Sequence, residues 1–198
     1  MSSEKGGWAN PGPAGLVALA IAALLFFALL KGYIDHSSGV YIGFWLLGGF
    51  IVQFTCALIE LKEGATTGGN VFLFFAGFFM FTGGLADILG YYAELYGWHM
   101  NALANGWAWI ILATSLILWT PAYMREAPRV FSTTVMDLCV MCVCVTLIKL
   151  GMGTPALVNI AAYTALIGAM LATYIAAAMV LNTAFQRVVF PLGSPWLK

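Results

Sequence analysis

Long apolar runs dominate this sequence and restrict its fold more than any other feature. A helix needs about 20 apolar residues to cross the hydrocarbon core of a bilayer, and six runs of that order follow one another. The runs are apolar on all sides, whereas the strands of a membrane β-barrel are shorter and alternate in polarity. We therefore predict six membrane-spanning helices, at about Pro13 to Tyr33, Val40 to Leu61, Val71 to Tyr91, Trp107 to Met124, Val130 to Leu150 and Leu157 to Leu181.

The composition agrees with a chain that lies almost entirely in lipid. Only 8% of the 198 residues are charged and 62% are hydrophobic, against about 25% charged in a soluble domain. Eight basic residues balanced by eight acidic ones leave no basic surface for nucleic acid. We predict an all-α integral membrane protein, one domain over residues 1–198, with a short tail of about 1–12 and another of about 184–198.

The cations between the runs predict an orientation. With the N-terminus inside, Lys31 and Lys149 face outward, and both termini are cytoplasmic, as the positive-inside rule favours. The first run is longer than the apolar part of a signal peptide, so we interpret it as a retained span. The cations on the cytoplasmic side are then Lys5, Lys62, Arg125, Arg129, Arg187 and Lys198.

Several residue groups are interpreted as packing or anchoring groups. Gly39 and Gly43 form a GxxxG pair, which lets helices approach closely in lipid. The sequence leaves open whether the neighbour is another span or another protomer. A small-residue stripe in the last run has the same meaning, and aromatic residues near the run ends are interpreted as interfacial anchors. The stripe is Ala161, Ala165, Ala169, Ala172 and Ala176; the anchors are Tyr91, Tyr92, Trp98, Trp107 and Trp109.

The sequence contains little that indicates an enzyme. His36 and His99 are the two histidines, both between runs, and no HExxH, GxSxG or glycine-rich phosphate loop is present. The cysteines lie within apolar runs, and the CxxCxC group spreads over different helix faces without a nearby histidine. We expect no catalytic residue, metal or cofactor, and packing roles for Cys56, Cys139, Cys142 and Cys144.

Polar groups inside the runs are more informative. An ionisable group in the membrane is by default a candidate for a permeation path or proton relay. Gln53, Glu60, Asp87 and Asp137 are such groups. Snorkelling toward the interface is an equally good interpretation for Glu60, and the role of Asp87 stays open. No lysine or arginine lies in the middle of a run, so a passing anion would be held by amides, hydroxyls and helix N-termini.

Three motifs resemble those of the acetate/succinate permease family, also called YaaH-like. The heptad Asn10-Pro11-Gly12-Pro13-Ala14-Gly15-Leu16 is similar to its NPxPLGL signature, with Ala14 in place of the usual leucine. A run from Gly48 to Gly68 carries Gln53 and Glu60 at the expected places. The segment VLNTAFQRVVFPLG, Val180 to Gly193, also agrees, with Gln186 replacing a glycine.

This resemblance implies a homohexamer in the cytoplasmic (inner) membrane, each protomer with its own path for small monocarboxylates. It also implies a constriction from the first, third and fifth spans, at the positions that match Leu19, Phe75 and Leu138. The family often has Phe and Tyr at the first two positions, so this ring is less aromatic and less polar. Asp137 stands where the resemblance implies a small polar residue.

We therefore expect a channel or proton-linked transporter for acetate and related small carboxylates, succinate among them. The expected path residues are Asn10, Pro11, Gln53, Glu60 and Asn182, with Asp137 as a proton or selectivity group. The alternatives are a neutral-solute channel for urea or short amides, and a membrane scaffold without transport. The sequence does not separate a channel from proton symport.

Overall fold

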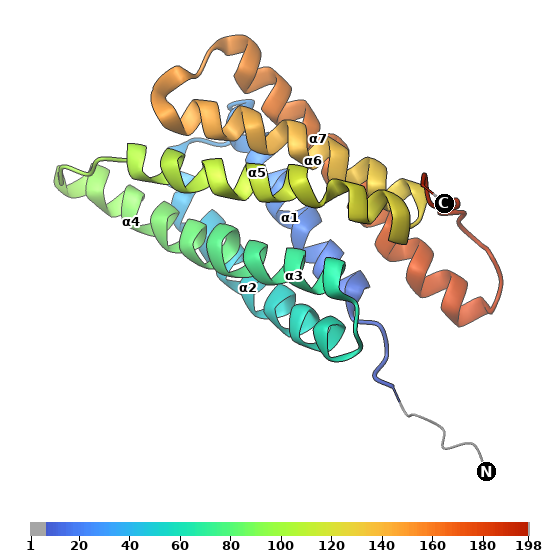
Figure 1. Cartoon of the computed structure of the whole chain (residues 1–198). Coiled ribbons are helices and arrows are strands. Elements are labelled where there is room, and N and C mark those ends of the chain that lie inside the picture. The colour runs from blue at the N-terminus through green and yellow to red at the C-terminus, as the bar shows by residue number, and fades with distance from the viewer. Residues whose placement is uncertain (1–6, 198) are drawn as a thin grey trace.

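The computed structural model describes residues 7–197, and over this range six long apolar helical spans form a bundle (Figure 1). The predicted all-α, six-span architecture is confirmed. Lys5 and Lys198, used in predicting the orientation, lie outside the described residues. The spans are α1 (Gly12–Leu30); a 3₁₀ turn (His36–Ser38) with α2 (Gly39–Lys62); α3 (Thr66–Phe74), η2 (Phe75–Phe81) and α4 (Thr82–Tyr96); α5 (Leu103–Glu126); α6 (Arg129–Leu147) with η3 (Ile148–Met152); and α7 (Pro155–Phe185).

Several helices are longer than the apolar runs that predict them. The third span covers Thr66–Tyr96 rather than about 71–91, and the last reaches Phe185 rather than about residue 181. A helix ends where its backbone conformation changes, not where hydropathy falls. Gly97 ends α4 with a left-handed conformation (φ 66°), and the Thr154 hydroxyl accepts the Leu157 N–H at 3.2 Å at the start of α7.

Two spans contain π-helical turns, which hydropathy does not predict. The turn η2 interrupts the third span, and η3 forms the end of the fifth span and contains Gly151, whose φ is 80°. The Thr82 hydroxyl donates to the Gly77 carbonyl oxygen at 3.0 Å, five residues earlier. Such turns change which side chains face the bundle interior and are frequent at functional sites.

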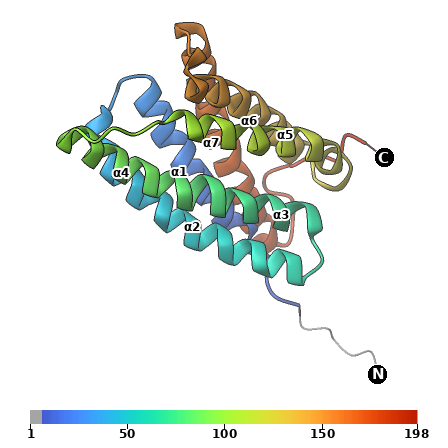
Figure 2. The same cartoon turned by 60° about the vertical axis from the view of Figure 1, so that its left-hand side comes forward.

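The helices follow one another around the bundle in a closed order. α1 packs along both α2 and α7, α6 lies between α5 and α7, and α2 packs against α3 and α4. Contacts between α3 and α5 complete the ring. Figures 1 and 2 show α5 crossing beside the third span, with α1 behind them. The interior of this ring is filled by one buried apolar cluster.

The small-residue faces pack within the chain. A Cβ atom at Gly43 would lie 2.6 Å from the Gly84 carbonyl oxygen and would also overlap Ile88 of α4. Ala161, Ala165 and Ala172 of α7 have no exposed surface. The neighbour of both faces is therefore another span of the same protomer.

Substituting Gly43→Ala should lower the stability of the folded protein by about 1–3 kcal/mol, because the added methyl overpacks the contact with α4. Thermal unfolding of purified protein in detergent measures the effect. Gly48→Ala is the matched control, since a Cβ placed there contacts no side chain and no neighbouring helix of the described residues within 4 Å. Equal losses of stability in the two variants would contradict the packing role of Gly43.

Candidate functional site

A cavity of about 530 Å³ lies at the end of the bundle that holds both ends of the described chain. We call it the terminal cavity. Asn10, Pro11 and Glu60 line it, so three of the predicted path residues come together here. Glu63 and Glu126 also line it, which makes this cavity acidic. The starts of α1, α3 and α6 and the ends of α2, α5 and α7 meet around it.

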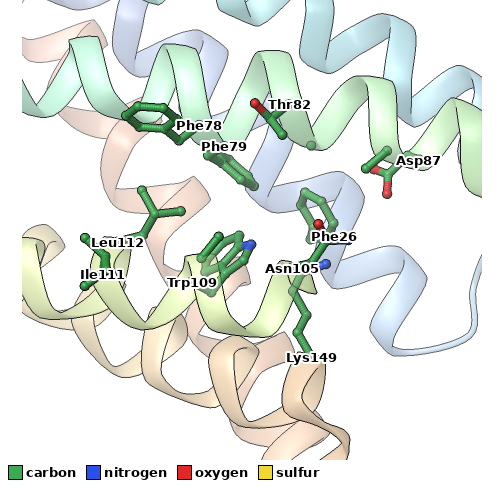
Figure 3. A pocket seen from close by; sticks show the side chains of 13 residues that line it. Phe26, Phe78, Phe79, Thr82, Asp87, Asn105, Trp109, Ile111, Leu112 and Lys149 are labelled. Carbon is green, nitrogen blue, oxygen red and sulfur yellow. The ribbon is translucent and has the colours of Figure 1, made fainter. Parts of the chain in front are cut away.

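A second cavity, of about 360 Å³, lies toward the opposite ends of these helices (Figure 3). We call it the distal cavity. Its apolar wall includes Phe26 of α1, Phe79 of η2 and Trp109 of α5. The ring centroids of Phe26 and Phe79 are 5.6 Å apart, and those of Phe79 and Trp109 are 5.7 Å apart. Asp87 and Lys149 add opposite charges to the same cavity.

The predicted constriction residues lie between the two cavities. Leu19, Phe75 and Leu138 are 9%, 5% and 5% exposed and belong to the buried apolar cluster. On α1, Leu19 lies between Gly12 and Phe26, which line opposite cavities and are about 21 Å apart along the axis. The third and fifth spans repeat this order, with Phe72, Phe75 and Phe78 on one and Phe131, Leu138 and Lys149 on the other. A packed apolar layer therefore separates the cavities.

Gln53 lies buried beside this layer, with 2% of its surface exposed. Its Nε2 donates to the Gly15 carbonyl oxygen at 3.2 Å, which orients the amide. Its Oε1 is buried and makes no hydrogen bond within residues 7–197. Gln53 therefore offers one free acceptor at mid-depth.

The start of α1 and the end of α2 shape the terminal cavity. Asn10 Oδ1 accepts the Gly12 N–H at 2.8 Å, although Pro11 occupies the N-cap position itself. Two glycines make room for the Glu60 carboxylate: a Cβ at Gly12 would lie 3.4 Å from Oε1, and one at Gly68 would overlap Oε2. Glu60 thus faces the cavity at close range.

Asp137 lies beside Leu138, as the sequence requires, and packs against α7. Its Oδ2 is buried without a hydrogen-bond partner in the described chain. A Cβ at Gly168 would lie 3.1 Å from this oxygen. The carboxylate therefore sits at the α6–α7 contact, near the constriction layer, and Asp137 lines neither the terminal nor the distal cavity as described.

Asn182 has a different environment from the one expected. Its Oδ1 accepts the N–H groups of Val189 and Phe190 at 2.7 and 3.0 Å, and its Nδ2 donates to the Phe190 carbonyl at 2.9 Å. These bonds hold the segment after α7, which then crosses toward α5 and α6. Val130 N–H donates to Leu192 O at 3.1 Å there. Substrate contact by Asn182 stays a prediction, whereas its hold on this segment is observed.

Some site residues have roles that sequence patterns did not reveal. Trp109 is buried, at 8% exposure, and lines the distal cavity, so its interpretation as an interfacial anchor is wrong. The charge pattern predicts only that Lys149 faces outward, whereas the structure places it in the wall of the distal cavity. A lysine at the end of a long apolar run is the signal in the sequence that could have indicated this position. The π-turn η3, to which Lys149 belongs, is not apparent from the sequence.

The described residues contain no group of three histidine, cysteine or acidic side chains arranged to hold a metal ion. Cys56, Cys139, Cys142 and Cys144 are free thiols. Cys56 Sγ lies 3.1 Å from the Pro11 carbonyl oxygen and contributes to the α1–α2 contact.

Substituting Asn182→Ala should release the segment after α7, because it removes three hydrogen bonds at a loss of about 1–3 kcal/mol. Faster hydrogen exchange at the Val189 and Phe190 amides measures this. Asn182→Asp is the matched control, since a carboxylate keeps both acceptor bonds. Unchanged hydrogen exchange at these amides in Asn182→Ala would show that Asn182 does not hold the segment after α7.

Comparisons with known proteins agree with this architecture. A model of the family described as GPR1/FUN34/yaaH matches residues 2–194. The chain is also similar to a solved structure, that of the bacterial acetate channel SatP. The TM-score is 0.76 at 23% sequence identity, covering 94% of this chain and 99% of that one. No functionally curated protein matches the chain.

Proposed function

Since the chain belongs to the GPR1/FUN34/yaaH family, we propose that it is a membrane path for acetate and related small carboxylates. The observation that carries this proposal is the arrangement of two cavities on either side of a packed apolar layer that contains Leu19, Phe75 and Leu138. The similarity to the fold of an acetate channel supports this choice of substrate class. The same comparisons do not favour a urea or short-amide channel.

Such a path has a physical use. A small carboxylic acid titrates near pH 4–5, so at neutral pH almost all acetate is an anion that crosses hydrocarbon poorly. The two cavities shorten the distance over which the substrate lacks water. Apolar side chains in the layer between them exclude water until the layer widens, which is the dewetting form of a gate.

The groups that receive the substrate are proposed along this path. Asn10, Pro11 and the first turn of α1 form a mouth at the terminal cavity, where the Asn10 amide and the positive end of the helix dipole favour a carboxylate. Glu60 opposes them and keeps the anion weakly bound, so that it does not remain trapped. Gln53 lies next along the path. The second N–H of its Nε2 can donate to a carboxylate, whereas its free Oε1 can accept only from water or from the protonated acid.

Asp137 is proposed as the proton-accepting group beside the gate. Burying an unpaired carboxylate in a low-dielectric environment is unfavourable, and its Oδ2 has no hydrogen bond from the described residues. Protonation relieves that cost. A proton taken up at Asp137 would move with the substrate if the protein is a symporter.

The proposed assembly and orientation follow the family resemblance and the charges. Lys62, Arg125 and Arg129 lie at the end of the bundle that carries both ends of the described chain, and Lys31 and Lys149 lie at the other. We place the terminal cavity on the cytoplasmic side of the inner membrane. A homohexamer with one path per protomer, and succinate as a further substrate, are part of the same proposal.

Purified protein in proteoliposomes should conduct acetate above the rate of protein-free vesicles. Gln53→Leu should lower this flux about fivefold to tenfold, because it removes one hydrogen bond from the path. Thr55→Val is the control on the same helix, since the Thr55 hydroxyl is exposed and bonds only to its own helix at Ile51 O, at 2.8 Å. Equal flux in all three proteins would remove Gln53 from the path.

The same vesicles separate the mechanisms when the membrane potential is clamped. Current driven by potential without a proton gradient indicates an anion channel, whereas flux that needs the gradient indicates symport and makes Asp137 the first candidate for the proton carrier. Urea flux without acetate flux would replace the proposed function with the neutral-solute alternative.

Substituting Leu19→Ala should widen the layer and raise butyrate flux relative to acetate flux by about tenfold. The ratio of the two fluxes in proteoliposomes is the measurement, because it cancels differences in protein content. Losing a buried leucine costs about 2–5 kcal/mol, so folding is checked by size-exclusion chromatography. Leu24→Ala, at a position that is 46% exposed, is the control and should leave the ratio unchanged.

A further inference from the structure

Asp87 lines two cavities at once. One is the distal cavity. The other, which we call the side cavity, has a volume of about 200 Å³ and is lined by His36, Gly39, Tyr91 and Glu94. The Gly39 position brings α2 close to this part of α4: a Cβ there would lie 3.1 Å from the Asp87 carbonyl oxygen. Asp87, together with Ala86, therefore lies where the side cavity adjoins the proposed substrate path.

Lys149 supplies the positive charge of the distal cavity. It belongs to the π-turn η3, and its Nζ lies 5.9 Å from the centre of the Trp109 ring, within cation–π range. Asn105 places an amide on the same wall. Figure 3 shows Asn105 and Lys149 on the side of the cavity opposite Asp87, with Phe26 and Phe79 nearby.

This wall has the chemistry of a small-carboxylate site. An ammonium group and an amide can donate hydrogen bonds to the two oxygens of a carboxylate. Phe26 and Phe79 offer an apolar surface to the methyl group of acetate. The cavity volume exceeds the size of a two-carbon acid, so the substrate can enter with part of its water.

Asp87 opposes this attraction. Its Oδ2 is buried and forms no hydrogen bond with the described residues, so a charge there is poorly compensated by neighbouring donors. The ionised carboxylate cancels much of the field that Lys149 adds to the cavity, because opposite charges at the walls of one low-dielectric cleft offset each other. A carboxylate substrate then meets little net attraction.

Few other titratable or charged side chains line the two cavities next to Asp87. The 3₁₀ turn contributes His36, η3 contributes Lys149, and α4 itself contributes Tyr91 and Glu94. From α1, α2 and α5, the cavity linings near Asp87 contain uncharged side chains. His36 and Glu94 face the side cavity rather than the distal one, so Asp87 is the acidic group shared by both.

We propose that Lys149 and Asn105 form a loading site for the carboxylate of the substrate. The ionised Asp87 side chain weakens anion binding at this site, and protonation of Asp87 removes that effect. This inference rests on the proposed function and adds a regulated loading step to it. Acid on the distal side neutralises Asp87, leaves the Lys149 charge unopposed and raises the local concentration of the anion. Alkaline conditions restore the opposing charge.

Acetate flux into proteoliposomes, with the same pH on both sides and varied between about pH 5 and pH 8, tests the inference. Each flux is corrected for protein-free vesicles and expressed relative to wild type at the same pH, which cancels the titration of acetate itself. The acetate flux of Asp87→Asn should exceed that of wild type roughly tenfold near the alkaline end of this pH range, through a lower apparent KM. The two fluxes should be equal near the acidic end of the range.

Substitutions of Lys149 test whether its charge attracts the substrate that Asp87 repels. Lys149→Met should raise the apparent KM at every pH, and Lys149→Arg, which keeps the charge, should restore most of the lost affinity. The double variant Asp87→Asn/Lys149→Met should have a higher apparent KM than Asp87→Asn at every pH and should lose the pH dependence, because neither wall charge remains. Glu94→Gln, which removes a charge from the side cavity only, should keep the wild-type pH profile.

Two results would overturn the inference while leaving the proposed function intact. One is a wild-type pH profile in Asp87→Asn with normal acetate flux. The other is an apparent KM of Asp87→Asn that does not change when Lys149→Met is added. Acetate flux that is absent from every folded variant, wild type included, would instead overturn the proposed function and this inference together.

Discussion

Close approach of helix backbones in the membrane is the condition on which the rest of this structure depends. Lipid gives helices no hydrophobic reason to associate, so contact area and the fit of small residues must hold them together. Gly43 against Gly84 joins α2 to α4, and the alanines of α7 give α1 a flat surface. With these contacts in place, α1 and α7 form one side of the ring, and larger side chains can fill its interior.

The interior divides by chemistry along the bundle axis. The middle is apolar and packed, with Leu19, Phe75 and Leu138 in one cluster. The ends are hollow and have largely apolar walls that carry a few charged groups, acidic at the terminal cavity and of mixed charge at the distal one. This division is suited to a solute that must be received by polar groups, lose water briefly and be released again.

The buried oxygens without partners share one property. Gln53 Oε1, Asp87 Oδ2 and Asp137 Oδ2 lack donors among the described residues, and an unsatisfied buried polar group costs about 1–3 kcal/mol. They lie on three different spans, near the apolar layer or the distal cavity. The bundle bears this cost at places where a proton, water or substrate would relieve it, which is the usual relation between local strain and function.

The membrane-spanning fold follows from the sequence alone, because each span must satisfy its own backbone hydrogen bonds within the bilayer and is visible as a long apolar run. The sequence also indicates the family, through motifs around Asn10, Gln53 and Val180 to Gly193. It could not place side chains at helix ends and π-turns. Trp109 and Lys149 line the distal cavity, and Asn182 binds the segment after α7. Helix rotation and local hydrogen bonds decide which way each of these side chains faces. Those depend on neighbours distant in sequence, and only the tertiary structure brings these together.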